Sequence, residues 1–148
     1  MGLIEKFKGK RIFLDTSPLI YFIEGNIKYQ KFLDSIFELN INRNIDFVTS
    51  SLTLIEVLVQ PLRLNRLDVV EKYETILTES DTIEIIDLNI SISRLAAEIR
   101  AKYNFKTPDS IQIATAIYSS SDFFLTNDKN LMHDSIEIIT LEKMVEVI

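Results

Sequence analysis

Four acidic residues occupy positions from which their carboxylates could hold a divalent cation. Asp15 and Asp128 each come after a short apolar run, Glu56 interrupts an apolar helical pattern, and Asp109 stands near the start of another helical pattern. Carboxylates that share a site repel one another, so such a cluster is best explained by a cation between them. Oxygen-only ligands favour Mg2+ or Mn2+. Such an ion holds phosphate oxygens, activates water and stabilises the charge that develops during phosphodiester cleavage.

Two of these acids also have an ordinary structural explanation. Asp15 precedes Thr16, Ser17 and Pro18, and an aspartate before a proline-initiated helix is a favoured N-cap. Asp109 would be favoured in the first turn of its helix by the helix dipole, with Thr107 as the N-cap. Either residue taken alone is explained at least as well by capping as by catalysis.

The other two acids are equally ambiguous when each is considered alone. Asp128 could cap a short helix through Leu131, and Glu56 could face solvent on a narrow polar stripe of its helix. The joint placement is the stronger signal, because at least two of the acids follow strands that end at the same edge of a sheet. The sequence therefore predicts a metal-dependent nuclease.

The rest of the composition excludes most other catalytic centres. The 148-residue chain has no cysteine and a single histidine, His133. Disulfides, a thiolate nucleophile, an iron–sulfur cluster, Cys-ligated zinc and a multi-histidine metal centre are thereby excluded. A Ser-His-Asp triad would need His133 itself, which we interpret as an ordinary exposed or cap-associated histidine. The net charge of −6 means that a nucleic acid would be bound locally rather than by bulk charge.

Short apolar runs alternate with longer segments of helical periodicity along the chain. Strands are expected over residues 11–15, 46–49, 82–86, 123–125 and 136–139, and helices over 18–24, 28–39, 52–59, 67–77, 90–103, 108–118 and from about 141. This alternation predicts an α/β fold with a mostly parallel sheet covered on both faces. Ligands of such sheets bind beyond the carboxyl ends of the strands.

No segment of the sequence marks a domain boundary. Three glycines and three prolines leave no room for a flexible linker, so residues 1–148 are expected to form one domain. No stretch has the length and apolarity of a signal peptide or a bilayer span, which predicts a cytoplasmic protein without a membrane partner. The basic residues of the segment before the first strand are expected at the end of that strand remote from Asp15: Lys6, Lys8, Lys10 and Arg11.

Four segments of the chain carry a resemblance to a known family. They are residues 12–24 with Asp15, 50–58 with Glu56, 107–116 with Asp109 and 124–131 with Asp128. In order and spacing they resemble the four motifs of PIN-domain nucleases, and the likeness is closest to the VapC-type toxin ribonucleases of toxin–antitoxin pairs. The similarity extends from about residue 11 to the end, whereas residues 1–10 have no clear counterpart in the family.

The resemblance implies a three-layer α/β/α sandwich and an endoribonuclease that depends on Mg2+ or Mn2+. It implies that the metal is bound, and RNA cut, by Asp15, Glu56, Asp109 and Asp128. Supporting side chains would be Thr16, Ser17 and Thr126. It also implies a homodimer and a small antitoxin that occludes the site. Asn130 stands where many relatives have an acid, which leaves open whether one or two metal ions are held.

Two lysines precede Asp109 closely enough in the sequence to lie near the site and contact RNA: Lys102 and Lys106. Cations are also favoured at the end of the preceding helix, which is an alternative explanation for them.

Two other functions are compatible with the sequence. A non-catalytic PIN-like module that binds RNA or protein is one alternative function. An aspartate-based phosphotransfer or phosphatase domain is another, but the phosphatase pattern needs a second acid where this chain has Ser17.

Overall fold

Five parallel strands form one sheet in the computed structural model, which describes residues 2–147 of the chain. The strands lie in the spatial order β3-β2-β1-β4-β5, and every neighbouring pair is parallel. Their bounds are β1 (Arg11–Leu14), β2 (Asp46–Ser50), β3 (Ile83–Ile86), β4 (Phe123–Thr126) and β5 (Glu137–Thr140). Each expected strand is therefore present, with its ends shifted by no more than one residue.

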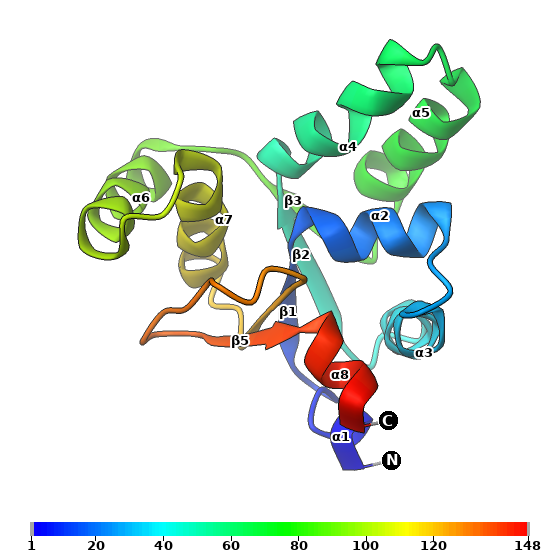
Figure 1. Ribbon diagram of the computed structural model, residues 1–148, viewed down its shortest axis with the longest axis horizontal. Helices are drawn as coiled ribbons and strands as arrows, with labels where there is room; N and C mark the ends of the chain where they lie inside the picture. Colours follow the sequence, from blue (N-terminus) through cyan, green and yellow to red (C-terminus); the bar gives the residue numbers. More distant parts are fainter. Residues whose placement is uncertain (1, 148) are drawn as a thin grey trace.

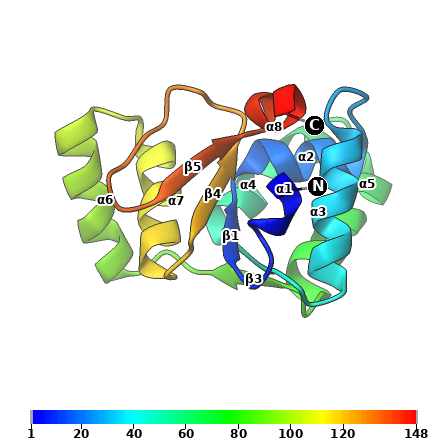
Figure 2. The same ribbon diagram turned by 90° about the horizontal axis from the view of Figure 1, so that it is seen from below.

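Helices cover both faces of this sheet, as Figures 1 and 2 show. One face is covered by α6 (Ile90–Tyr103) and α7 (Thr107–Tyr118). The opposite face is covered by α1 (Gly2–Glu5), α2 (Thr16–Glu24), α3 (Gln30–Ile41), α4 (Ser51–Arg63), α5 (Leu67–Glu74) and α8 (Leu141–Val147). The predicted three-layer α/β/α architecture with a parallel central sheet is confirmed. No helix among the described residues is long and apolar enough to cross a membrane.

The apolar runs of the central strands supply both halves of the core. Along β1, Ile12 and Leu14 join the core on one face, whereas Phe13 joins the core on the other. Phe13 stacks on Phe124 of β4 with ring centroids 5.2 Å apart. Because both faces are buried, these strands are mainly apolar rather than alternating, and β1 and β4 carry polar side chains only at their ends.

The strand order places a topological switch point between β1 and β4. The chain builds β1, β2 and β3 outward in one direction and then returns to place β4 on the other side of β1. The Asp15 backbone N–H donates to the Leu125 carbonyl at 2.9 Å, which fixes the ends of β1 and β4 beside each other. This carboxyl edge is where open α/β sheets place their ligands.

Two helices end three or four residues away from their expected ends. α4 continues through Pro61 to Arg63 rather than ending at residue 59. A proline inside a helix removes one backbone hydrogen bond, but Pro61 is buried and its carbonyl accepts from the Arg66 N–H at 2.8 Å. The helix expected over 67–77 ends at residue 74 and continues as a π-helical turn, η1 (Thr75–Glu79), with Tyr73 and Leu77 both buried.

Two local capping predictions are wrong. Residues 127–136 form turns rather than a short helix through Leu131, and the Asp128 carboxylate accepts the Asn130 N–H at 2.9 Å. Such a bond to the backbone two residues on is an Asx turn, which competes with helix formation. Helix α7 begins at Thr107 itself, so Lys106 rather than Thr107 holds the N-cap position, without a side-chain capping bond.

The N-terminal segment packs into the core at the end of the sheet remote from the switch point. Phe7 is 1% exposed and meets Phe123 edge-to-face with centroids 5.2 Å apart. Gly9 has a φ of 76°, which glycine adopts readily, and its N–H donates to the Asn44 carbonyl at 2.7 Å. Lys6 pairs with Glu137, the first residue of β5, at 3.1 Å. The expectation that this basic segment lies away from Asp15 is confirmed.

We predict that Phe7→Ala lowers the free energy of unfolding by about 3–5 kcal/mol, because it empties an aromatic site in the core. Urea denaturation followed by circular dichroism measures this change. Ile27, which is fully exposed, supplies the control, and Ile27→Ala should change the same quantity by less than about 0.5 kcal/mol. An unfolding free energy of Phe7→Ala equal to that of wild type would show that this segment only rests on the fold.

Candidate active site

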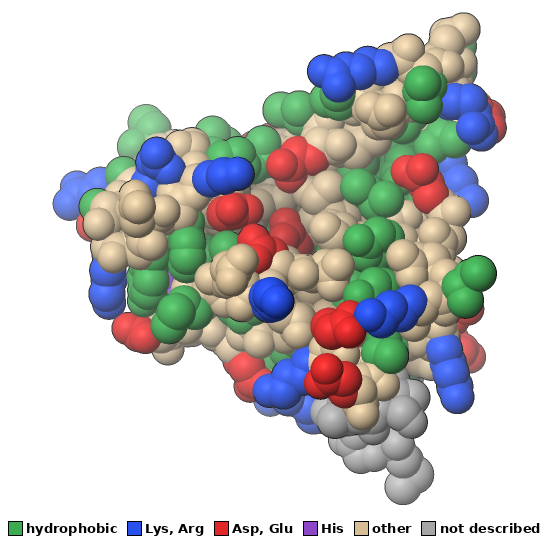
Figure 3. Space-filling model, viewed as in Figure 1, with side chains coloured by type: hydrophobic (Ala, Val, Ile, Leu, Met, Phe, Trp, Pro, Cys, Tyr) green, Lys and Arg blue, Asp and Glu red, His purple; other side chains and the backbone are tan. Residues whose placement is uncertain are grey.

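The four acidic residues are carried by elements that end or begin at the carboxyl edge. Asp15 directly follows β1 and is the N-cap of α2, where its Oδ1 accepts the Thr16 N–H at 2.9 Å. Asp128 lies two residues after β4, Asp109 lies in the first turn of α7, and Glu56 lies in the second turn of α4. Figure 3 shows acidic side chains gathered over the region where α2, α4 and α7 begin.

A buried hydroxyl connects the two strand-end aspartates. Thr126 is 0% exposed, and its Oγ1 donates to Asp15 Oδ2 at 2.7 Å. The same oxygen accepts the backbone N–H of Asp128 at 3.0 Å. Thr126 therefore fixes the Asp15 carboxylate and the turn of Asp128 relative to each other.

Thr16 connects a third carboxylate to this arrangement. Its Oγ1 donates to Glu56 Oε1 at 2.5 Å, while its backbone N–H caps into Asp15. The two acids are thus held on either side of one residue. Ser17, expected in a similar supporting role, makes no side-chain hydrogen bond to another residue in the described part of the chain.

The charges of the four carboxylates act on one another. Burial raises the pKa of Asp109, and the negative charges of Asp15 and Asp128 raise it further, against a smaller opposing effect of Lys106. Burial also raises the pKa of Asp15, and so does the charge of Glu56, although hydrogen bonds from Thr126 and Thr16 oppose the change. Acids that disfavour one another's ionisation in this way form a single electrostatic cluster.

The donor set of this cluster fits a hard divalent cation. Every candidate ligand is a carboxylate oxygen, with threonine hydroxyls beside them, and this chemistry suits Mg2+ or Mn2+ better than zinc or copper. Among the described residues, no group of three or more His, Cys, Asp or Glu is spaced to hold a metal ion. The carboxylates of Asp15, Glu56 and Asp128 are turned toward hydroxyl and amide donors instead.

The two lysines proposed for RNA contact differ in their surroundings. Lys106 is close enough to Asp109 to affect its ionisation. Lys102 is drawn away to Asp134, with its Nζ 3.3 Å from the carboxylate. His133 accepts the Ser135 N–H at 2.9 Å within a local turn, and burial lowers the pKa of its imidazole.

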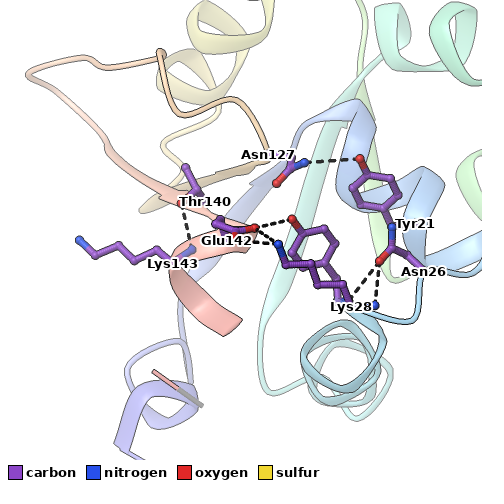
Figure 4. A network of polar contacts seen from close by, with 8 residues as sticks. Tyr21, Asn26, Lys28, Asn127, Thr140, Glu142 and Lys143 are labelled. Carbon is purple, nitrogen blue, oxygen red and sulfur yellow. Dashed lines mark hydrogen bonds and ion pairs between the residues drawn. The ribbon is translucent and has the colours of Figure 1, made fainter. Parts of the chain in front are cut away.

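A second polar network, which the sequence did not reveal, supports the loop after β4. The Asn127 amide donates to the Tyr21 hydroxyl at 3.4 Å (Figure 4), and Tyr21 stacks on Tyr29 with centroids 5.4 Å apart. Tyr29 donates to Glu142 of α8 at 2.7 Å, and Lys28 pairs with the same carboxylate. These residues come from distant segments, and no local pattern in the sequence indicates that they meet.

Fold and site together define the class of the protein: an α/β/α domain with a parallel sheet and clustered carboxylates at its switch point. The family model of the PIN domain matches residues 12–134. The chain therefore belongs to the PIN domain family, and the family resemblance inferred from the four motifs is confirmed.

Other proteins share parts of this chain or its fold. An uncharacterized protein of Archaeoglobus fulgidus is 32% identical over 59 residues, which are 40% of this chain and 93% of that protein. A toxin–antitoxin complex from Klebsiella pneumoniae contains a chain with a TM-score of 0.68 and 21% identity, covering 88% of this chain and 97% of that chain.

Two further solved structures have the same fold. A chain of VapBC2 from Rickettsia felis, solved bound to a DNA fragment from its promoter, has a TM-score of 0.66 and 17% identity and covers 88% of this chain and 98% of its own. VapC20 of Mycobacterium tuberculosis, a toxin that cleaves the sarcin–ricin loop, has a TM-score of 0.60 and 15% identity. The match covers 76% of this chain and 86% of the VapC20 chain. At these identities the similarity shows a common fold.

We predict that Asp109→Asn leaves the metal-free protein as stable as wild type, or more stable. Relief of repulsion is worth on the order of 1 kcal/mol, and loss of an acid from the first helical turn opposes it by about 0.3–1 kcal/mol. Magnesium should raise the melting temperature of wild type by mass action and that of the variant much less. Thermal melts in EDTA and in Mg2+ measure both effects.

The matched control for this prediction is Asp34→Asn, which neutralises an exposed acid on α3. Its magnesium-dependent shift should equal that of wild type. The contrary result is that Asp109→Asn melts at a lower temperature than wild type in EDTA and that Mg2+ raises both melting temperatures equally. Asp109 would then stabilise only the N-terminus of α7 and would not bind the cation.

Proposed function

We propose that this protein is an endoribonuclease that depends on Mg2+ or Mn2+ and acts as the toxin of a toxin–antitoxin pair. The observation that carries the proposal is the electrostatic coupling of Asp15, Glu56, Asp109 and Asp128 at the switch point of a PIN-domain sheet. Membership of the PIN family supports nuclease activity. The name of the sarcin–ricin loop cleaving toxin supports RNA as the substrate.

Each residue of the site has a role in this proposal. Asp15, Glu56, Asp109 and Asp128 would bind the cation, which when bound neutralises phosphate charge and activates water. Thr126 and Thr16 keep the carboxylates of Asp15 and Glu56 oriented through the hydrogen bonds described above, and Ser17 is assigned to the same supporting group. Lys106 would contact the RNA phosphates beside the acids, and Lys102 would do so only after leaving Asp134.

The proposal includes two protein partners. The toxin–antitoxin complexes among the structural neighbours support a small antitoxin that covers the site. A homodimer is supported by an exposed apolar stripe on α4, formed by Ile55, Val59 and Leu62, which are 61%, 38% and 54% exposed. Their spacing of four and three residues puts them on one face of the helix. With cellular RNA as the substrate, we propose that the protein acts in the cytoplasm.

Cleavage should require a divalent cation, because the clustered carboxylates otherwise repel the phosphate as well as one another. Total cellular RNA is incubated with the protein in Mg2+, in Mn2+ and in EDTA, and the new RNA ends are mapped. We expect discrete ends with either metal, none in EDTA, and recovery when excess Mg2+ is added. Cleavage in full EDTA would reject the metal mechanism, and RNA binding without cleavage would assign a non-catalytic PIN-like module.

The Asp15→Asn variant should cut RNA at least about 100-fold more slowly, the usual scale for losing one charged contact in the transition state. Its fold should persist, because asparagine can still accept the Thr16 N–H as an N-cap. Single-turnover cleavage rates measure the loss, and melting curves check the fold. The exposed Asp34→Asn should cut at the wild-type rate. Undiminished cleavage by Asp15→Asn in matched metal would remove Asp15 from the site.

A further inference from the structure

Four polar side chains form a buried network directly behind the carboxylate cluster. They come from β2, α4 and α7 and are at most 2% exposed: Thr49, Ser50, Thr53 and Gln112. We call this group the polar bridge. All four residues lie in segments whose other buried residues are mainly apolar, so their burial needs an explanation beyond filling the core.

The hydrogen bonds of the polar bridge form one continuous network that ends on the backbone of β1. Gln112 Nε2 donates to Thr53 Oγ1 at 2.7 Å, and the Thr53 and Thr49 hydroxyls lie 2.8 Å apart. Thr49 Oγ1 is also 2.8 Å from the Leu14 carbonyl, which can only accept. The Thr49 hydroxyl is therefore the donor to both the Thr53 hydroxyl and the Leu14 carbonyl, and since a hydroxyl has one proton it shares that proton between the two acceptors. At the other end, Ser50 Oγ donates to Gln112 Oε1.

The polar bridge contacts the same elements that carry three of the acids. Leu14 immediately precedes Asp15 on the chain. Thr53 lies three residues before Glu56 on α4, and Gln112 lies three residues after Asp109 on α7. One helical turn therefore separates each acid on a helix from its contact in the bridge. Gln112 is the member that joins α7 to both β2 and α4.

Stability alone does not account for such a network. A buried hydrogen bond adds only about 0.5–1.5 kcal/mol net in folded proteins, whereas an unsatisfied partner costs more than that. Apolar side chains would hold the helices on the sheet without this risk. Hydrogen bonds differ from apolar packing in that they fix direction and length, so their effect is on the relative placement of β1, α4 and α7.

We propose that Gln112 is a positioning residue that sets the distances among Asp15, Glu56 and Asp109, and thereby the affinity of the cluster for a divalent cation. The inference rests on the proposed metal-dependent function. Thr16 and Thr126 each bind an individual carboxylate, whereas Gln112 in addition joins the elements that carry the acids. Gln112 also acts on Asp15 itself: burial raises the pKa of that carboxyl, and a side-chain hydrogen bond from Gln112 weakly lowers it.

The test replaces Gln112 by methionine, which conserves length and volume and removes the amide. Melting temperature is followed against Mn2+ concentration for the intact protein, and the midpoint of the rise is compared with wild type. Loss of a positioning contact behind a metal site should raise that midpoint by about 10- to 100-fold. The Mn2+ concentration for half-maximal RNA cleavage should rise in parallel, while the melting temperature in EDTA changes by only a few degrees.

Thr115→Val is the matched control. Thr115 is as buried as Gln112 and lies one turn further along α7, but its hydroxyl donates only within the helix, to the Ile111 carbonyl at 2.7 Å. This variant should keep the wild-type Mn2+ midpoint. If it raises the midpoint as much as Gln112→Met does, general loosening of α7 explains the effect and the proposal is wrong.

If Gln112→Met does not fold, two variants of Thr53 test the same positioning role. Thr53→Ser retains the hydroxyl of the bridge and should keep the wild-type midpoint, whereas Thr53→Val should raise it. Wild-type midpoints for both Gln112→Met and Thr53→Val would overturn the positioning role while leaving the nuclease proposal intact. A wild-type protein that shows neither a Mn2+ shift nor cleavage would overturn the proposed function instead.

Discussion

Repulsion among carboxylates at one edge of the sheet is the constraint on which the site depends. The fold gathers acids from two strand ends and two helices. Burial raises the pKa of Asp109 and the charges of Asp15 and Asp128 raise it further, whereas the pKa of Asp15 is raised mainly by burial and less by the charge of Glu56. Folding against this repulsion costs stability, which the apolar core on both faces of the sheet must supply. Two threonine hydroxyls offset part of the cost by donating to Asp15 and Glu56.

The parallel sheet explains why this edge, rather than another, collects the chemistry. Strands buried on both faces leave no polar position until they end, so the first polar residues after β1 and β4 emerge together at the switch point. The opposite edge is used differently: Phe7 and the turn at Gly9 close it with apolar and backbone contacts. The end of the sheet near Phe7 is therefore stabilised by apolar burial, whereas the carboxyl end carries the acidic side chains.

The carboxylates are supported by side chains at increasing distances from them. Thr16 and Thr126 touch carboxylates directly, the Tyr21–Asn127 contact supports the loop beside Asp128, and the polar bridge links the helices behind them. A cation site requires its ligands within a few tenths of an ångström of their working positions. Directional hydrogen bonds meet that requirement better than apolar packing does. The proposed nuclease would thus use buried polar residues to orient its site, beside the apolar core that stabilises the fold.

The sequence by itself determined the layers of the fold and the strand ends that carry Asp15 and Asp128, because apolar periodicity reports burial and strand length directly. It also supplied the four motifs. Apolar periodicity does not report three features that only the tertiary structure decided. These are the continuation of α4 past Pro61, the burial of Phe7 in the core, and the pairing of the buried polar groups. Ser50 and Gln112 lie 62 positions apart in the chain. Gln112 looks like an isolated polar residue in an apolar segment, and Ser50 looks like one of several small polar residues where a strand ends. Only the packing of α7 against β2 makes them partners.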